Sequence, residues 1–144
     1  MKTTDNVDVF FHNRAVPDFY IENRTKRWIN KVVGEEGRQA GIITVVLGDD
    51  DFLNKLNNEY LHHDELTDVI TFDYSSESNG ISGDIFVSVE RVEENAKEYG
   101  VGFREEFHRV IIHGVLHLIG YSDKDEQGAK EMREKENHYL TYLD

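Results

Sequence analysis

The sequence predicts an α/β fold of the α+β kind, in which about five helices pack on a small four-stranded mixed sheet. Three observations support this prediction. The 144 residues are the size of one domain and are enough to bury a hydrophobic core. Apolar runs with strand character alternate with amphipathic stretches of helical period. No repeat, low-complexity tract or linker interrupts them, so residues 1–144 are expected to form a single domain.

The first half of the chain alternates strands with helices. Residues 7–11 predict a short strand, and a helix is expected over about 17–36 with the only proline in its first turn. The continuous β-branched run at 41–47 is typical of a strand buried on both faces. Asp49 or Asp50 can cap the next helix, which carries apolar residues along one side.

A hairpin and three helices are expected in the second half. The strands at 69–74 and 83–87 flank a polar loop at 75–80, so they are expected to pair as neighbours. Three helices follow: 88–100, capped by Ser88 and ended by Gly100, then 103–119, and an amphipathic helix at 126–142. This order of elements predicts the mixed sheet.

Composition limits the kinds of site and partner. The chain has no cysteine, so any zinc must be bound by histidine and carboxylate side chains. No apolar signal-peptide core is present at the N-terminus, and the longest aliphatic run, 42–47, is too short to cross a bilayer. We therefore expect a cytoplasmic protein without a membrane partner.

Charge argues against indiscriminate nucleic-acid binding. The formal net charge is −13, from 29 acidic and 16 basic residues. A local basic segment stands out nevertheless: Arg24, Lys26, Arg27, Lys31 and Arg38. The basic residues around 24–31 are candidate contacts for an RNA backbone, and the alternative is that the segment is an ordinary solvated helix face.

The most informative stretch is 113–123, which spaces potential metal ligands as H-x3-H-x5-D. His113 and His117 lie about 40° apart around a helix, so both imidazoles leave the same face. Gly120 can end the helix and turn the chain back, so that Asp123 becomes a third ligand. Three protein ligands with an open fourth position are typical of catalytic zinc. Asp125 is the alternative third ligand if the turn is longer.

The helix around the two histidines excludes one familiar class of zinc enzyme. Position 114 is glycine, where zinc proteases of the H-E-x-x-H type carry the glutamate that acts as general base. A protease is therefore not expected. Glycine is unfavourable inside a helix by about 1 kcal/mol relative to alanine. Its presence predicts that another helix or a substrate approaches the backbone closely at Gly114.

A family resemblance rests on several motifs in collinear order. The stretch HGVLHLIGYSD at 113–123 resembles the H-G-x-L-H-L-x-G-Y signature of the YbeY-type rRNA maturation endoribonucleases. The segments LNNEY at 56–60, TDVITF at 67–72 and GDI at 83–85 are similar to further motifs of that family. Met132 and Glu136 match its terminal helix. The similarity extends from about residue 40 to the C-terminus.

The resemblance implies a zinc-dependent endoribonuclease that prefers single strands and takes part in small-subunit rRNA processing and ribosome quality control. Its expected partners are RNA, as an rRNA precursor, and the ribosomal small subunit or its proteins; no DNA is expected. His113 and His117 would be metal ligands and catalytic residues, with one zinc ion. The third family histidine falls on Asp123, which still offers zinc an oxygen ligand.

A second departure concerns phosphate binding. A functionally important arginine of the family falls on Leu61, and a nearby lysine falls on His63. Leucine cannot donate hydrogen bonds to phosphate. His63, or its neighbour His62, is the candidate catalytic substitute, although both could equally be solvated loop residues. The rival hypothesis is therefore a non-catalytic ribosome-assembly factor that keeps the metal as part of its fold.

Overall fold

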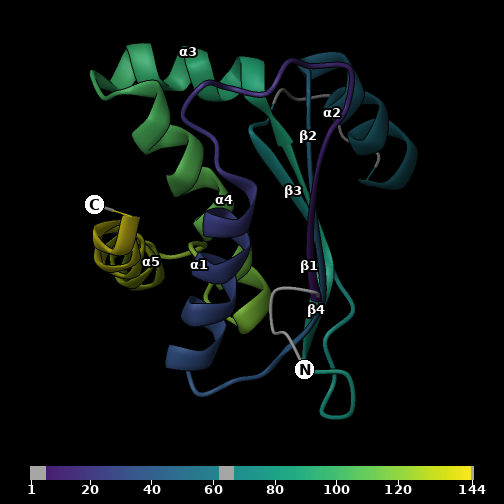
Figure 1. The fold of residues 1–144 in the computed structure, drawn as a ribbon, viewed down its shortest axis with the longest axis vertical. Helices are drawn as coiled ribbons and strands as arrows, with labels where there is room; N and C mark the ends of the chain where they lie inside the picture. The colour runs from purple at the N-terminus through teal and green to yellow at the C-terminus, as the bar shows by residue number, and fades with distance from the viewer. Residues whose placement is uncertain (1–5, 62–66, 144) are drawn as a thin grey trace.

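The computed structural model describes residues 6–61 and 67–143. Within that part of the chain, five α-helices pack around four strands (Figure 1). The strands are β1 (Val7–Phe11), β2 (Ala40–Gly48), β3 (Val69–Asp73) and β4 (Ile81–Ser88). The helices are α1 (Glu22–Glu35), α2 (Asp50–Leu56), α3 (Val89–Tyr99), α4 (Phe103–Ile119) and α5 (Glu126–Leu140). No helix in the described ranges is both long and apolar enough to span a membrane.

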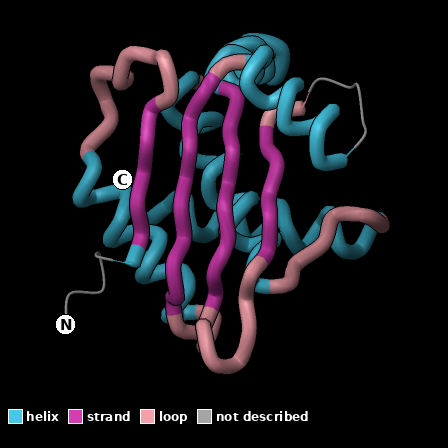
Figure 2. The backbone as a smooth tube through the Cα atoms, turned by 90° about the vertical axis from the view of Figure 1, so that its right-hand side faces the viewer, coloured by secondary structure: helices cyan, strands magenta, loops and turns pink. Residues whose placement is uncertain are grey.

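The strands form one sheet in the order β1-β2-β4-β3. β1 and β4 pair in parallel with β2, and β3 pairs antiparallel with β4, with which it forms a hairpin. Figure 2 shows the four strands side by side, with most of the helices behind them. The predicted four-stranded mixed sheet with about five helices is thereby confirmed.

The helices cover the two faces of the sheet unequally. Figure 1 shows α1, α4 and α5 on one side, while α2 lies on the other side near one end. In β2, Ile43, Val45 and Leu47 are fully buried, but Ile42 is 70% exposed. The prediction that this strand is buried on both faces was therefore wrong. A β-branched run also suits a strand with only one covered face, because strand propensity does not distinguish the faces.

The start of the first helix differs from the prediction, whereas the cap of the second was foreseen. Helix α1 begins at Glu22, because Pro17 instead opens a turn in which its carbonyl accepts a hydrogen bond from Tyr20 N (3.0 Å). Of the two predicted caps, Asp49 is the one that caps α2, with its side chain accepting from Phe52 N (2.9 Å). The α-helix then ends at residue 56 and continues as one π-helical turn, Asn57–Leu61.

The three C-terminal helices largely follow the prediction. Ser88 caps α3, its hydroxyl accepting from Arg91 N at 3.2 Å, and Gly100 ends the helix with φ 69°. Helix α4 has the predicted bounds, and its apolar side chains are buried against β3, β4 and neighbouring helices. Helix α5 ends at residue 140 and is followed by a short 3-10 turn, Thr141–Leu143.

Gly114 lies where α4 crosses the sheet. A Cβ atom at this position would be 2.7 Å from Cγ2 of Ile85 in β4. The close approach expected from the sequence is therefore made by a strand, and neither another helix nor a substrate is needed to explain the glycine. It lets the helix that carries His113 and His117 pack directly onto the sheet.

Replacing Gly114 with alanine is expected to lower the free energy of unfolding by about 1–3 kcal/mol, because the new methyl group overlaps Ile85. The matched control is Gly34→Ala in α1, where an added Cβ meets no atom within 4 Å. There alanine should raise stability by up to about 1 kcal/mol. Chemical denaturation of both variants, and of Gly114→Ala combined with Ile85→Ala, tests the argument. Additive effects in the double variant would contradict it.

Candidate active site

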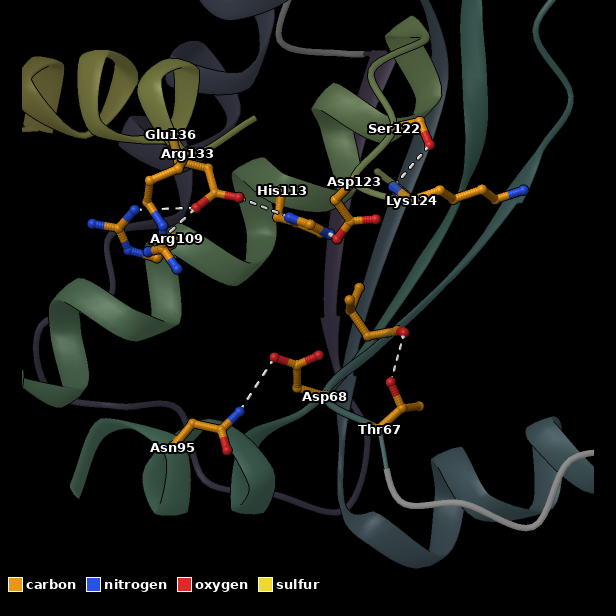
Figure 3. Close-up of polar contacts among 11 residues, drawn as sticks. Thr67, Asp68, Asn95, Arg109, His113, Ser122, Asp123, Lys124, Arg133 and Glu136 are labelled. Carbon is orange, nitrogen blue, oxygen red and sulfur yellow. Dashed lines mark hydrogen bonds and ion pairs between the residues drawn. The ribbon is translucent and has the colours of Figure 1, made fainter. Parts of the chain in front are cut away.

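Helix α4 and the loop after it bring His113 and Asp123 together (Figure 3). Nε2 of His113 lies 3.6 Å from Oδ2 of Asp123. Gly120 ends the helix with φ 128°, a conformation that favours glycine, and the chain turns back as its position predicted. Two of the three proposed ligands are therefore close in space although they are ten residues apart.

Helix α5 supplies Glu136, which binds the other nitrogen of the same ring. Nδ1 of His113 donates to Oε2 of Glu136 at 2.7 Å, and the glutamate side chain is only 6% exposed. An ionised carboxylate can only accept hydrogen bonds, so this contact places the proton on Nδ1. The lone pair of neutral His113 is then on Nε2, which faces Asp123. A carboxylate behind an imidazole in this way fixes the tautomer and orientation of a metal-ligating histidine.

Two arginines compensate the buried charge of Glu136. Nη1 of Arg109 is 3.1 Å from Oε1 of Glu136, and Nη1 of Arg133 is 3.7 Å from the same oxygen. Arg109 is nearly buried, with 13% of its side chain exposed, and also approaches Glu105 at 3.6 Å. Arg133 is 61% exposed. A buried carboxylate needs such partners to remain ionised beside an apolar core.

His117 lies one helical turn from His113 and is half-buried. The two ring centroids are 6.0 Å apart and the rings are inclined by 77°. Within residues 6–61 and 67–143, the imidazole of His117 forms neither a hydrogen bond nor an ion pair. No three histidine, aspartate or glutamate side chains of those residues already converge as a set that could hold a metal.

The donor atoms of His113 and Asp123 nevertheless suit a metal ion. Nitrogen and oxygen ligands at about 2.0–2.2 Å from a tetrahedral zinc are separated by about 3.4 Å. The observed separation of 3.6 Å is close to that value. Burial disfavours the charged ring, but Glu136, Asp123 and Asp68 together raise the pKa of His113. A metal at Nε2 must therefore compete with a proton.

A cleft of about 270 Å³ opens beside these residues. Its lining includes His113, Asp123 and Glu136 together with Asp68, which immediately precedes β3. Figure 3 shows the Asp68 carboxylate pointing into the space below His113 and Asp123. Burial raises the pKa of Asp68, although His113 and a hydrogen bond from Asn95 (3.3 Å) act against that shift. The cleft thus places several acidic groups around one imidazole.

Comparison with known proteins places the chain in a family. The family model described as Endoribonuclease YbeY matches residues 9–144. The chain belongs to the YbeY endoribonuclease family. The protein named Endoribonuclease YbeY from Flavobacterium johnsoniae is 53% identical over 113 residues, which cover 78% of this chain and 81% of that protein. Its namesake from Flavobacterium psychrophilum is 46% identical over 125 residues, covering 85% of this chain and 89% of that one.

A solved structure supports the assignment of the fold. The solution structure of TM1509 from Thermotoga maritima is similar with a TM-score of 0.67 and 30% sequence identity. The match covers 93% of this chain and 86% of that one. The YbeY resemblance stated from the motifs alone is thereby confirmed.

The structure places Asp125 away from the candidate site, and it describes the region of His63 only in part. Asp125 caps α5, its side chain accepting from Gly128 N at 2.6 Å, and is thus engaged away from His113. Leu61 ends the π-helical turn. The side chain of Leu61, and all of His62 and His63, lie outside the described residues, so the catalytic role assigned to His63 stays a prediction.

The basic residues around 24–31 proposed to contact RNA are not equally available. A guanidinium nitrogen of Arg24 donates to the carbonyl of Leu143. Lys26 lies within 4.0 Å of both Asp8 and Glu22 and is 18% exposed. Arg27 is exposed. Lys31 is exposed, with Nζ 4.9 Å from the centroid of the Tyr142 ring. Internal contacts of Arg24 and Lys26 weaken their assignment as RNA contacts more than that of Arg27 or Lys31.

Sequence reasoning assigned no role to several residues of the cleft. Glu136 was matched only as part of a family helix, and Asp68 only as part of the segment at 67–72. Arg109 precedes His113 by four residues, so helical periodicity could have placed both on one face. The contact of α5 with α4 that brings Glu136 to His113 leaves no comparable local signal in the sequence.

Proposed function

We propose that this member of the YbeY family is a zinc-dependent endoribonuclease that cleaves single-stranded regions of small-subunit rRNA precursors in the cytoplasm. His113, His117 and Asp123 would hold the zinc ion. The observation that carries the proposal is the 3.6 Å approach of His113 and Asp123 while Glu136 binds the opposite nitrogen of the ring. That arrangement prepares the imidazole as a metal ligand.

Each group in the cleft then has a role. Zinc would supply Lewis-acid charge next to the scissile phosphate. Glu136 keeps Nδ1 of His113 protonated and orients the ring, while Arg109 and Arg133 compensate the charge of Glu136. Asp68, whose pKa is raised by burial, is placed to take or release a proton near the reacting groups.

Metal removal tests the zinc requirement. A chelator-treated protein is expected to lose cleavage of a single-stranded precursor-rRNA fragment and to regain it with one equivalent of zinc. Mapping the product ends identifies the nucleophile, because a 2′,3′-cyclic phosphate shows attack by the RNA 2′-hydroxyl and excludes direct attack by water. Unchanged cleavage after verified loss of metal would contradict zinc dependence. A zinc-loaded protein that binds precursor RNA without cleaving it would instead support the assembly-factor hypothesis.

A further inference from the structure

Glu106 is a buried carboxylate that lines the same cleft. It is 4% exposed, and its side chain forms neither a hydrogen bond nor an ion pair within the described residues. Burial and the nearby charge of Asp68 raise its pKa, although the charges of Arg109 and Arg133 act against that shift. A carboxylate that lines a cleft and accepts no hydrogen bond from the described residues can accept hydrogen bonds from a ligand.

The hollow around Glu106 continues beyond the proposed metal ligands. Glu106 lines the cleft of about 270 Å³ that contains His113 and also an adjoining hollow of about 150 Å³. Tyr99 and Arg133 line both spaces. A ligand in the adjoining hollow would therefore lie next to a group bound at His113.

The rim of this hollow carries an aromatic ring and an available cation. Tyr99, the last residue of α3, is 60% exposed. Arg133 is 61% exposed, and its closest approach to Glu136, 3.7 Å, is too long for a hydrogen bond. Within residues 6–61 and 67–143 its guanidinium donates no hydrogen bond, so it can bind an anion such as phosphate. Neither side chain belongs to the hydrophobic core, so both are available to a ligand.

Together these three groups match the parts of one nucleotide in a single strand. Unpaired RNA bases are bound by stacking on aromatic side chains and by hydrogen bonds to their Watson–Crick edges. A carboxylate offers two adjacent acceptor oxygens. Guanine presents two adjacent donors on that edge, N1–H and the 2-amino group. Adenine and cytosine present one amino group beside an acceptor nitrogen, and uracil presents one N–H between two carbonyls.

We propose that Tyr99, Glu106 and Arg133 form a base subsite that selects guanine in the nucleotide next to the scissile phosphodiester. Glu106 accepts from N1 and the 2-amino group, Tyr99 stacks on the ring, and Arg133 binds the adjoining phosphate. The inference rests on the proposed endoribonuclease function, because it assigns a sequence preference to that same cleft.

Four oligouridylate strands test the subsite, each with uridine, guanosine, adenosine or cytidine at one central position. Zinc-loaded wild-type protein is expected to cleave at a fixed offset from the guanosine, with kcat/KM about tenfold above that of the all-uridine strand. Glu106→Gln should abolish most of this preference for guanosine. One carboxylate oxygen is replaced by the amide NH2 group, which is itself a donor and cannot accept a hydrogen bond from guanine. Thermal unfolding of each variant verifies that it is folded.

Matched variants separate specific contacts of Tyr99 and Arg133 with RNA from the general loss of an exposed ring or charge. Tyr99→Ala should weaken binding of every strand, whereas Tyr74→Ala, which removes a tyrosine of similar exposure (58%) in the loop after β3, should not. Arg133→Gln should raise KM more than Lys130→Gln, which removes an exposed charge from the preceding turn of α5. Equal effects of the two charge removals would indicate diffuse attraction and would overturn the assignment of Arg133.

The outcomes also distinguish this inference from the proposed function. Cleavage without any base preference overturns the subsite and leaves the nuclease intact. Equal loss of kcat on all four strands in Glu106→Gln also overturns it, because Glu106 would then serve the reaction itself. If the wild type cleaves none of the strands, the nuclease proposal fails for these substrates. Fluorescence anisotropy then decides the subsite: preferential binding of the guanosine strand that depends on Glu106 supports it, and equal binding overturns it.

Discussion

His117→Ala is expected to lower cleavage of single-stranded precursor rRNA by at least about a hundredfold, because loss of one member of a cooperating set removes most of its catalysis. The imidazole has no structural hydrogen bond or ion pair to lose within the described residues. Its replacement should therefore affect metal binding more than folding. Zinc stoichiometry and cleavage are measured on wild type and variant purified identically.

Two further variants make this result decisive. Asp123→Ala changes a loop side chain that is 47% exposed, so it should lower zinc affinity and cleavage without unfolding the protein. His138→Ala removes a 54% exposed histidine of α5 outside the cleft and should leave both properties unchanged. Equal cleavage by wild type and His117→Ala would reveal a contaminating nuclease and would remove the support for a catalytic metal at this histidine.

Glu136→Gln is expected to reduce zinc affinity by about ten- to a hundredfold, the usual effect of removing a carboxylate behind a metal-ligating histidine. Glutamine can still occupy the space but cannot serve both His113 and Arg109 as an ionised acceptor. Glu136→Ala should in addition lower the free energy of unfolding by about 3–5 kcal/mol, because it leaves the nearly buried Arg109 without its closest partner. Chelator competition and chemical denaturation measure the two effects.

Glu105→Gln is the matched control for the charge on Arg109. Glu105 lies 3.6 Å from Arg109, on the exposed side of α4, and is not a partner of His113. Its replacement should leave zinc affinity within about twofold of wild type, since exposed ion pairs contribute little. If Glu136→Gln binds zinc as tightly as Glu105→Gln, then Glu136 does not prepare His113 as a ligand.

Local patterns were sufficient where one short segment decides its own structure. The bounds of α4 and the caps Asp49 and Ser88 were predicted correctly, because capping and helical period depend on residues within one or two turns. The start of α1 was not, since a proline suits a turn as well as a first helical turn. The burial of β2 depends on which helices cover each face of the sheet, and this cannot be predicted from a local pattern.

The sequence by itself determined the family, the mixed sheet and the spacing that brings His113 and Asp123 to one place, because these depend on motif order and on a glycine-ended helix. Only the tertiary structure decided what surrounds them. Glu136 reaches His113 from a helix 23 residues further along the chain, and Gly114 is explained by a strand that precedes it. Side chains this distant meet only when apolar faces pack, so their contacts follow from the whole core and not from any one segment.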